Sequence, residues 1–149
     1  EVNFPVTPAF LATKSPTQTN VTGNGTLVTI TYETEIFDQN ADYNAGTSTF
    51  TAPVSGRYFF STAVAIGGMT SAHTRGLQTI VTSNRTYQGQ DLNVFSVMNS
   101  DGAFRFCQSC FADMDTSDTC IIQTNVFNGT QVIFMNASAS VWFSGFLQC

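Results

Sequence analysis

Charge is the scarcest property of this sequence. Asp, Glu, Lys and Arg make up 10% of its 149 residues, against about 25% in a typical globular domain. The formal net charge is −5, and the arginines stand singly along the chain, at Arg57, Arg75, Arg85 and Arg105. Because a protein that binds nucleic acid needs a basic stripe to displace the counterions of the phosphates, this composition excludes nucleic acid as a partner.

Long apolar runs and helix-forming residues are also missing. No run approaches the roughly 18 apolar residues of a membrane-spanning helix, so membrane insertion is not expected. The start at Glu1, without Met or a signal-peptide pattern, predicts a mature chain or one cut from a longer protein. Lys14 is the single lysine, whereas Phe occurs 14 times and Thr, Ser and Asn are abundant. These residues favour an all-β protein with a neutral polar surface and almost no helix.

Groups suited to catalysis are few. His73 is the single histidine, and no Gly-x-Ser-x-Gly nucleophile elbow is present. Asp113 and Asp115 lie two residues apart in a turn, and such neighbours rarely converge on one scissile bond. We therefore predict a protein that is not an enzyme.

The four cysteines lie in the last third of the chain, at Cys107, Cys110, Cys120 and Cys149. The first two have the CxxC spacing of zinc and redox sites, but a zinc site needs a second such pair or paired histidines. Buried thiols or one to two disulfides are the preferred interpretation. In a strand, residues 107 and 110 point to opposite faces, whereas a Cys110–Cys120 bridge across the acidic turn between them is conceivable. Cys149 could pair with any of the other three, bond a neighbouring chain or stay free.

Alternating apolar residues separated by turn signals every eight to twelve residues or so are typical of a sandwich or barrel. They predict ten strands, at 9–14, 26–33, 48–52, 57–66, 76–83, 85–89, 103–112, 119–127, 131–136 and 139–147. Segment 57–66 is nearly continuously apolar, which indicates a central strand. No linker or repeat interrupts the pattern, so residues 1–149 are predicted to form one domain, with 1–7 as an extended segment that could follow a stalk or another domain.

Five short pieces of the sequence occur in a telling order. A Phe-centred strand at Pro8-Ala9-Phe10-Leu11-Ala12 is followed by Phe37-Asp38 with an Asp42-Tyr43-Asn44 turn. Residues 49–60 read Thr-Phe-Thr-Ala-Pro-Val-Ser-Gly-Arg-Tyr-Phe-Phe, in which Pro53 and Gly56 bracket a tight turn. An acidic turn at 112–119 precedes the closing Phe143-Ser144-Gly145-Phe146-Leu147. In this order and spacing the chain resembles the complement-one-q (C1q) globular head family, which shares its jelly roll with tumour necrosis factor.

The resemblance implies a ten-stranded, two-sheet jelly-roll sandwich that assembles as a homotrimer, with one sheet of each subunit facing the three-fold axis. It would explain why the closing strand carries large groups on both faces. Ser117 departs from the family pattern, which has Gly before Asp118, and segment 84–102 matches no part of it. The candidates for the core and the trimer interface are Phe10, Phe50, Tyr58, Phe60, Trp142, Phe143, Gly145 and Phe146.

Three sets of residues are candidate sites. Tyr can stack on sugars and polar side chains can bond their hydroxyls, so the ligand-binding candidates are Arg85, Tyr87, Gln88, Asp91 and His73. An outer-sheet hairpin with an ordinary surface is the favoured alternative for this segment. Carboxylates of the acidic turn could hold calcium, or could simply form the turn; they are Asp113, Asp115 and Asp118. Asn-x-Ser/Thr sequons predict glycosylation in a secreted eukaryotic protein, at Asn20, Asn24, Asn84, Asn128 and Asn136.

These expectations converge on a trimeric attachment head without a cofactor, located on a virion or outside the cell. The low charge and the Thr- and Asn-rich strands are similar to heads on bacteriophage fibres and other virion proteins, which bind a host-surface receptor or glycan. Two alternatives stay open. One is a secreted recognition protein of the complement or lectin type, and the other is a purely architectural fibre or filament subunit.

Overall fold

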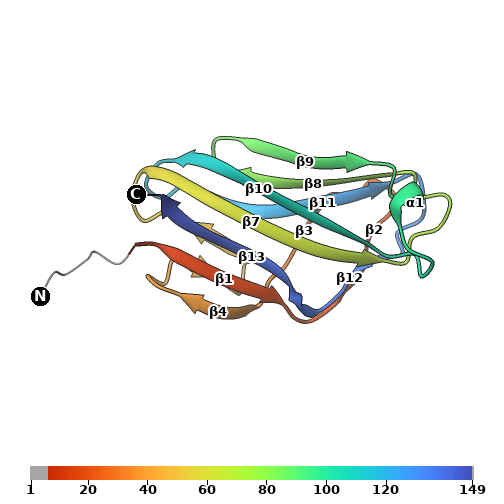
Figure 1. Ribbon diagram of the computed structural model, residues 1–149, viewed down its shortest axis with the longest axis horizontal. Helices are drawn as coiled ribbons and strands as arrows, with labels where there is room; N and C mark the ends of the chain where they lie inside the picture. The colour runs from red at the N-terminus through yellow and green to blue at the C-terminus, as the bar shows by residue number, and fades with distance from the viewer. Residues whose placement is uncertain (1–6, 149) are drawn as a thin grey trace, which may run out of the picture.

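Two antiparallel β-sheets pack face to face in the computed structural model, which describes residues 7–148 (Figure 1). Sheet A has the order β2-β12-β7-β13-β1-β4, with β10 paired to β7. Its strands are β1 (Ala9–Lys14), β2 (Gln18–Thr22), β4 (Thr34–Asp38), β7 (Gly56–Gly67), β10 (Phe104–Met114), β12 (Ile133–Met135) and β13 (Ser138–Gln148).

Sheet B has the order β5-β6-β11-β8-β9, with β3 paired to β11. Its strands are β3 (Val28–Thr29), β5 (Tyr43–Asn44), β6 (Thr49–Thr51), β8 (Arg75–Thr82), β9 (Thr86–Leu92) and β11 (Thr119–Phe127). One helical turn, α1 (Val94–Val97), lies at the end of the sandwich opposite the end of β13 (Figure 1). No helix within residues 7–148 is long and apolar enough to cross a membrane.

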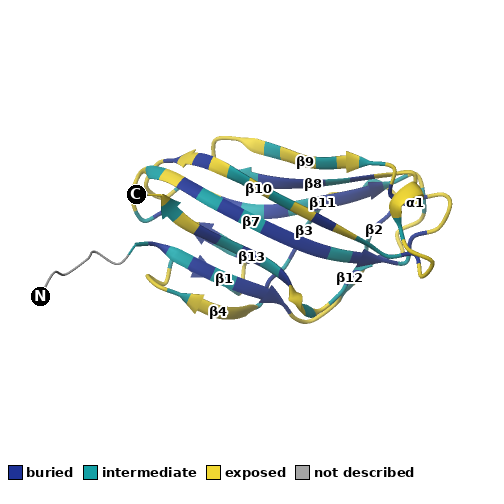
Figure 2. Cartoon of the chain, viewed as in Figure 1, coloured by how far each residue is buried: buried dark blue, intermediate teal, exposed yellow. Residues whose placement is uncertain are grey.

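The all-β jelly-roll prediction is confirmed, and so is the central place of segment 57–66. It forms β7, which lies between β10 and β13. Figure 2 shows β7 largely buried, whereas β4 and β9, at the sheet edges, are largely exposed. The extended segment predicted for residues 1–7 lies outside the described residues except for Thr7.

The prediction of one strand at 26–33 is wrong, because only Val28–Thr29 (β3) join a sheet there. Side chains of other segments take the backbone groups that a strand partner would take. The backbone N–H of Tyr32 donates to Ser48 Oγ at 2.7 Å, and Lys14 Nζ donates to the Thr31 carbonyl at 2.9 Å. Tyr32 is fully buried although it belongs to no strand. The short strands β2, β4 and β5 were not predicted, since their residues are mostly polar or exposed.

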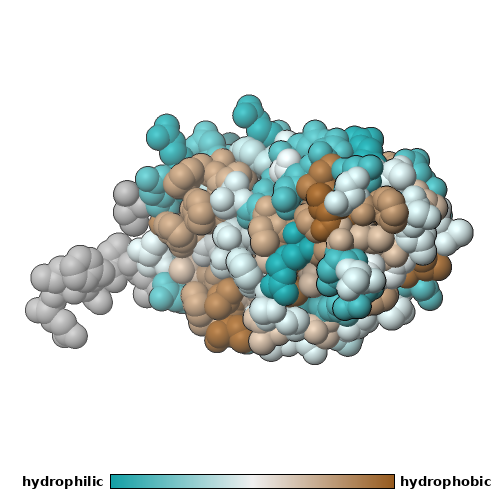
Figure 3. Space-filling model, turned by 45° about the vertical axis from the view of Figure 1, so that its right-hand side comes forward, coloured by the Kyte–Doolittle hydropathy of each residue, from teal (hydrophilic) through white to brown (hydrophobic). Residues whose placement is uncertain are grey.

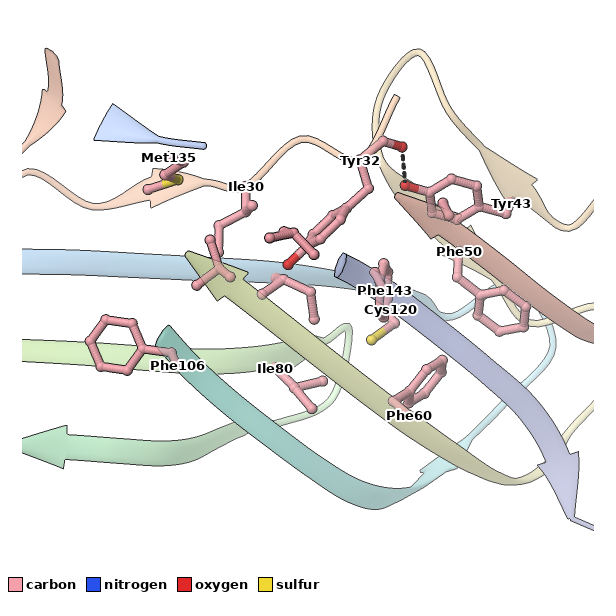
Figure 4. Close-up of a cluster of buried hydrophobic side chains, with 14 of the residues drawn as sticks. Ile30, Tyr32, Tyr43, Phe50, Phe60, Ile80, Phe106, Cys120, Met135 and Phe143 are labelled. Atoms are coloured by element: carbon pink, nitrogen blue, oxygen red, sulfur yellow. Dashed lines mark hydrogen bonds between the residues drawn. The ribbon is translucent and has the colours of Figure 1, made fainter. Parts of the chain in front are cut away.

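An aromatic cluster fills the space between the sheets (Figure 4). Phe10 stacks on Tyr43 with ring centroids 4.7 Å apart and on Phe50 at 5.0 Å, and Phe143 meets it edge-on at 4.9 Å. Gly145 is required beneath this cluster, since a Cβ there would lie 2.5 Å from the Phe60 ring. These contacts explain why the motif pieces near residues 10, 50 and 143 occur together: they form one core.

Candidate functional site

The outer face of sheet A carries a row of aromatic side chains across three strands. Phe111 on β10 is opposite Phe59 on β7, which is opposite Phe146 on β13. The Phe59 ring centroid lies 5.1 Å from that of Phe111 and 5.5 Å from that of Phe146. Phe111 is nevertheless 56% exposed and Phe146 45% exposed. Three packed rings that stay open to water indicate a surface suited to burial against another molecule.

The row continues toward the edge of the sheet. Leu11 on β1 is opposite Phe37 on β4, and Phe37 is 44% exposed. Leu11 is diagonal to Phe146, because Leu11 is opposite Ser144, and such diagonal neighbours are within side-chain reach. We call this surface the apolar band; it consists of Phe111, Phe59, Phe146, Leu11 and Phe37. Figure 3 shows apolar side chains gathered on this face, at the end of the molecule where β1 begins.

On the β7–β10 part of this face, charges lie only toward the two ends of the strands. Arg57 is opposite Asp113 at one end of the β7–β10 pair, and Arg105 is opposite Ala65 toward the other. The outward residues between them are all uncharged: Phe59, Ser61 and Ala63 on β7, and Cys107, Ser109 and Phe111 on β10. Burial of the middle of this face would therefore leave no charge unpaired.

The residues predicted for the core and the trimer interface lie on two different faces of the sheets. Phe10, Phe50, Tyr58, Phe60 and Phe143 are buried between the sheets. Trp142 and Phe146 lie on the outer face of sheet A, where Trp142 Nε1 donates to Ser61 Oγ at 3.4 Å. Trp142 also lines a shallow cavity of about 220 Å³ beside Cys107.

The described cysteines are free thiols. Cys107 is exposed on the outer face, whereas Cys110 points inward and Cys120 is buried. Their opposite directions confirm that 107 and 110 are poor disulfide partners. Burial raises the pKa of the Cys110 thiol to about 11 and that of Cys120 well above its ordinary value. Such thiols are weak nucleophiles. Cys149 lies outside the described residues.

The ligand-binding candidates on and before β9 do not form one site. The Asp91 carboxylate accepts two hydrogen bonds from Arg75, at 2.8 and 2.7 Å, and this pairing lowers the pKa of Asp91. The Arg75 guanidinium in turn lies 5.0 Å from the Phe127 ring centroid. Tyr87 is partly buried against the core, while Arg85 and Gln88 are exposed. The hairpin is thus well ordered, but its polar groups are directed to neighbours or to solvent.

His73 lies in the interior, with 1% of its surface exposed. Its Nδ1 accepts the backbone N–H of Thr70 at 2.9 Å, and Nε2 lies 3.1 Å from the Thr130 carbonyl. A carbonyl only accepts, so Nε2 is the donor in this contact. Gly23 and Gly129 give it room, since a Cβ at either would come within 3.0 Å of the ring. The ring therefore ties two loops together.

The acidic turn satisfies its own backbone. Asp118 Oδ2 accepts the backbone N–H of Asp115 at 2.9 Å and also a bond from Asn84 Nδ2. Ser117 has φ +74°, the left-handed conformation that glycine adopts without strain. No cluster of three or more His, Cys, Asp or Glu side chains that could hold a metal occurs in the described part of the chain. These contacts support the turn-forming role of Asp118.

Four of the sequon asparagines, Asn20, Asn24, Asn84 and Asn128, are exposed, and Asn136 is partly buried. Asn24 Oδ1 accepts the hydroxyl of Thr26 at 2.7 Å. Attachment of a glycan at the exposed positions would not require unfolding.

Comparison with known proteins gives a consistent result. Residues 9–148 match the C1q domain family. The structure is similar to the globular domain of zebrafish complement 1qA protein, with a TM-score of 0.66 and 17% identity over 96% of this chain and 98% of that one. It is also similar to murine APRIL at pH 8.5, with a TM-score of 0.63 and 9% identity over 96% and 99% of the two chains. No curated protein sequence matches the chain.

Proposed function

Because the chain belongs to the C1q domain family, we propose that it is a non-enzymatic recognition head whose subunits associate as a trimer through the apolar band on sheet A. The family's domains are generally recognition domains, and its members are typically secreted or extracellular. The observation that carries the trimer is the exposed aromatic row at Phe111, Phe59 and Phe146.

The composition of the apolar band supports association with a second copy of the chain. Interface cores are rich in aromatic side chains and poor in charge, and the band has both properties. Its edge residue Phe37 lies on β4 at one side of the sheet, beside Ile36, which is 56% exposed, while Phe111 lies on β10 at the other side. Two different edges joined head to tail generate a closed ring when the rotation between subunits closes.

Light scattering tests this assembly. The expected mass is about three times 16.1 kDa, with and without reductant, because no bond between cysteines is needed. Phe111→Asp should yield a folded monomer, since it places a charge within the apolar interface. Phe95→Asp is the matched control, because Phe95 is 42% exposed on α1 and lies outside the band. A trimer that tolerates Phe111→Asp would refute the band as the interface.

The finer proposal is that the head belongs to a virion and attaches it to a host receptor or glycan. Its support is the sequence likeness to phage-fibre heads and the avidity that three weak sites would supply. The labelled trimer should bind host cells, and the monomeric Phe111→Asp chain should bind them at least tenfold more weakly. The exposed sequons favour the secreted recognition protein instead, and intact mass after expression in eukaryotic secretory cells would distinguish the two.

A further inference from the structure

A second concave surface lies on sheet A, toward α1 and away from the aromatic row. The cavity measures about 430 Å³, within the range of small-molecule sites. Arg105 and Phe111 are six residues apart on the same face of β10, which corresponds to about 20 Å along the strand. Its lining residues are Ala65, Val97, Asn99, Ala103, Phe104, Arg105 and Asn136.

Arg105 is held in place without being neutralised. Its Nη1 donates to the Ser140 carbonyl at 2.6 Å, and Nη2 donates to Ser140 Oγ at 3.2 Å. A guanidinium has five N–H donors, so three are left for a ligand. The residue opposite it on β7 is the small, neutral Ala65.

The rest of the lining contains no opposing charge. Arg75, in contrast, forms an ion pair with Asp91, and Arg57 is opposite Asp113 on the neighbouring strand. Every other residue that lines the cavity is neutral. Arg105 is therefore the one charged residue among the described residues that line the cavity, and its hydrogen bonds to Ser140 fix its direction.

Neutral hydrogen-bonding groups stand beside the guanidinium. Asn99 Oδ1 accepts the backbone N–H groups of Asp101 at 3.0 Å and Ala103 at 2.9 Å. Because backbone N–H groups only donate, these two bonds distinguish the Asn99 side-chain oxygen from its nitrogen. Asn99 Nδ2 is then left to donate to a ligand. Asn136 lies on the other side, where its backbone N–H donates to the Ala65 carbonyl at 3.0 Å.

The remaining wall is apolar. Val97 is 48% exposed beside Ala65 and Ala103, whereas the Phe104 ring is directed to the other face of β10, where its centroid lies 5.0 Å from that of the buried Phe106. Binding sites for polar small molecules combine such a wall with a few placed polar groups.

We propose that this cavity binds an acidic saccharide. Arg105 pairs with its carboxylate or sulfate, Asn99 and Asn136 bond the neighbouring hydroxyls, and Val97 contacts the apolar side of the ring. This assignment rests on the proposed recognition function and names its ligand class. It does not depend on the trimer, because the cavity is formed within one chain.

Ligand-observed NMR with sodium glucuronate, glucose and sodium sulfate tests the assignment. The chain is produced in bacteria without glycosylation, which keeps the Asn136 sequon bare. Glucuronate is expected to bind at least tenfold more tightly than glucose, because only glucuronate offers a carboxylate to Arg105. It is also expected to bind more tightly than sulfate, because sulfate has no ring to contact Val97.

Arg105→Gln should weaken glucuronate binding at least tenfold. The control is Arg57→Gln, which removes the same charge from the same face but lies opposite Asp113, and its binding should be unchanged. Equal loss in both variants would mean nonspecific attraction and would overturn the proposal. Sulfate binding as tight as glucuronate would overturn the saccharide assignment.

Light scattering on the same samples separates the two proposals. A trimer that does not bind glucuronate contradicts the ligand assignment and leaves the assembly intact. A monomer whose glucuronate binding depends on Arg105 supports the ligand site and refutes the assembly.

Discussion

Gly145 offers the sharpest test of how the sequence determines the core. A Cβ added there would lie 2.5 and 2.7 Å from Phe60 ring carbons and 2.9 Å from Phe10 Cε1. Neither ring can turn aside easily, because Phe60 packs against Phe50 at 5.5 Å and Phe10 packs against Phe143 at 4.9 Å between ring centroids. Gly145→Ala must therefore move at least one packed ring.

The magnitude follows from two opposing effects. Overpacking a well-filled core costs about 1–3 kcal/mol. Replacing Gly by Ala also restricts the unfolded chain, which returns about 0.4–1 kcal/mol where the backbone permits Ala. Gly145 does not have a left-handed φ, so the second effect applies in full. Gly145→Ala should lower the free energy of unfolding by roughly 0.5–2 kcal/mol.

Urea unfolding followed by the fluorescence of Trp142, the single tryptophan, measures this loss. The chain concentration is held constant, because association adds to apparent stability. Phe60→Leu should relieve the clash, so the double variant should be more stable than the sum of the single losses predicts, by about 0.5–3 kcal/mol. Ser144→Ala, on the outer face, is the control. If Gly145→Ala is neutral, or the two changes are additive, the steric reasoning is refuted.

Four further predictions concern single residues. Ser117→Gly should raise the free energy of unfolding by about 0.5–1 kcal/mol, because φ at Ser117 is +74°; unchanged stability in urea would contradict this. Burial lowers the pKa of Lys14 to about 8 from 10.5, so the unfolded chain binds more protons between these values and stability should rise there with pH. The stability difference between the wild type and Lys14→Met should show that rise, and a flat difference would exclude it. In the monomeric Phe111→Asp chain with Cys149→Ser, Cys107 should react before the other described cysteines with a thiol reagent, since Cys110 and Cys120 are shielded and have raised pKa values; a fast phase that survives Cys107→Ala in that background would contradict this. His73→Ala should cost about 2–4 kcal/mol in a thermal or urea assay, because it opens a cavity and leaves buried backbone groups unpaired, and a loss under 1 kcal/mol would argue against the loop-tying role.

The long strands could be predicted because their partners impose a simple pattern. In β11, residues 120, 122, 124 and 126 are all buried beneath the sheet, and such alternation is visible in the sequence. Segment 26–33 has the same alternation, yet Ile30 and Tyr32 are buried outside the ladder. The residues of the segment itself do not indicate that Lys14 donates to its Thr31 carbonyl or that Ser48 accepts its Tyr32 N–H. Those bonds join residues 16 and 17 positions apart.

The sites were less predictable than the strands for the same reason. His73 reads as a loop residue, and only Gly23 and Gly129, far away in the sequence, show that its ring is enclosed. The cavity around Arg105 is formed by β7, the segment after α1, the start of β10 and the residue after β12. Arg105 belongs to no sequence motif that indicates a binding site, whereas the hairpin at 84–91 was predicted as a site because polar side chains are dense there. Residues 1–149 as one domain stays a prediction.

The distribution of charge over sheet A links the assembly to the ligand site. A face that is buried in a trimer must be neutral in its middle, since an unpaired buried charge costs several kcal/mol or more. The chain meets this condition with serines, alanine and phenylalanines between Arg57 and Arg105. Arg57 has Asp113 opposite it, so an unbound Arg105 is the charge on β7 and β10 without a carboxylate opposite it. An acidic ligand would neutralise Arg105 in each subunit. Ligand binding should therefore stabilise the trimer, and the dissociation temperature should rise with glucuronate but not with glucose.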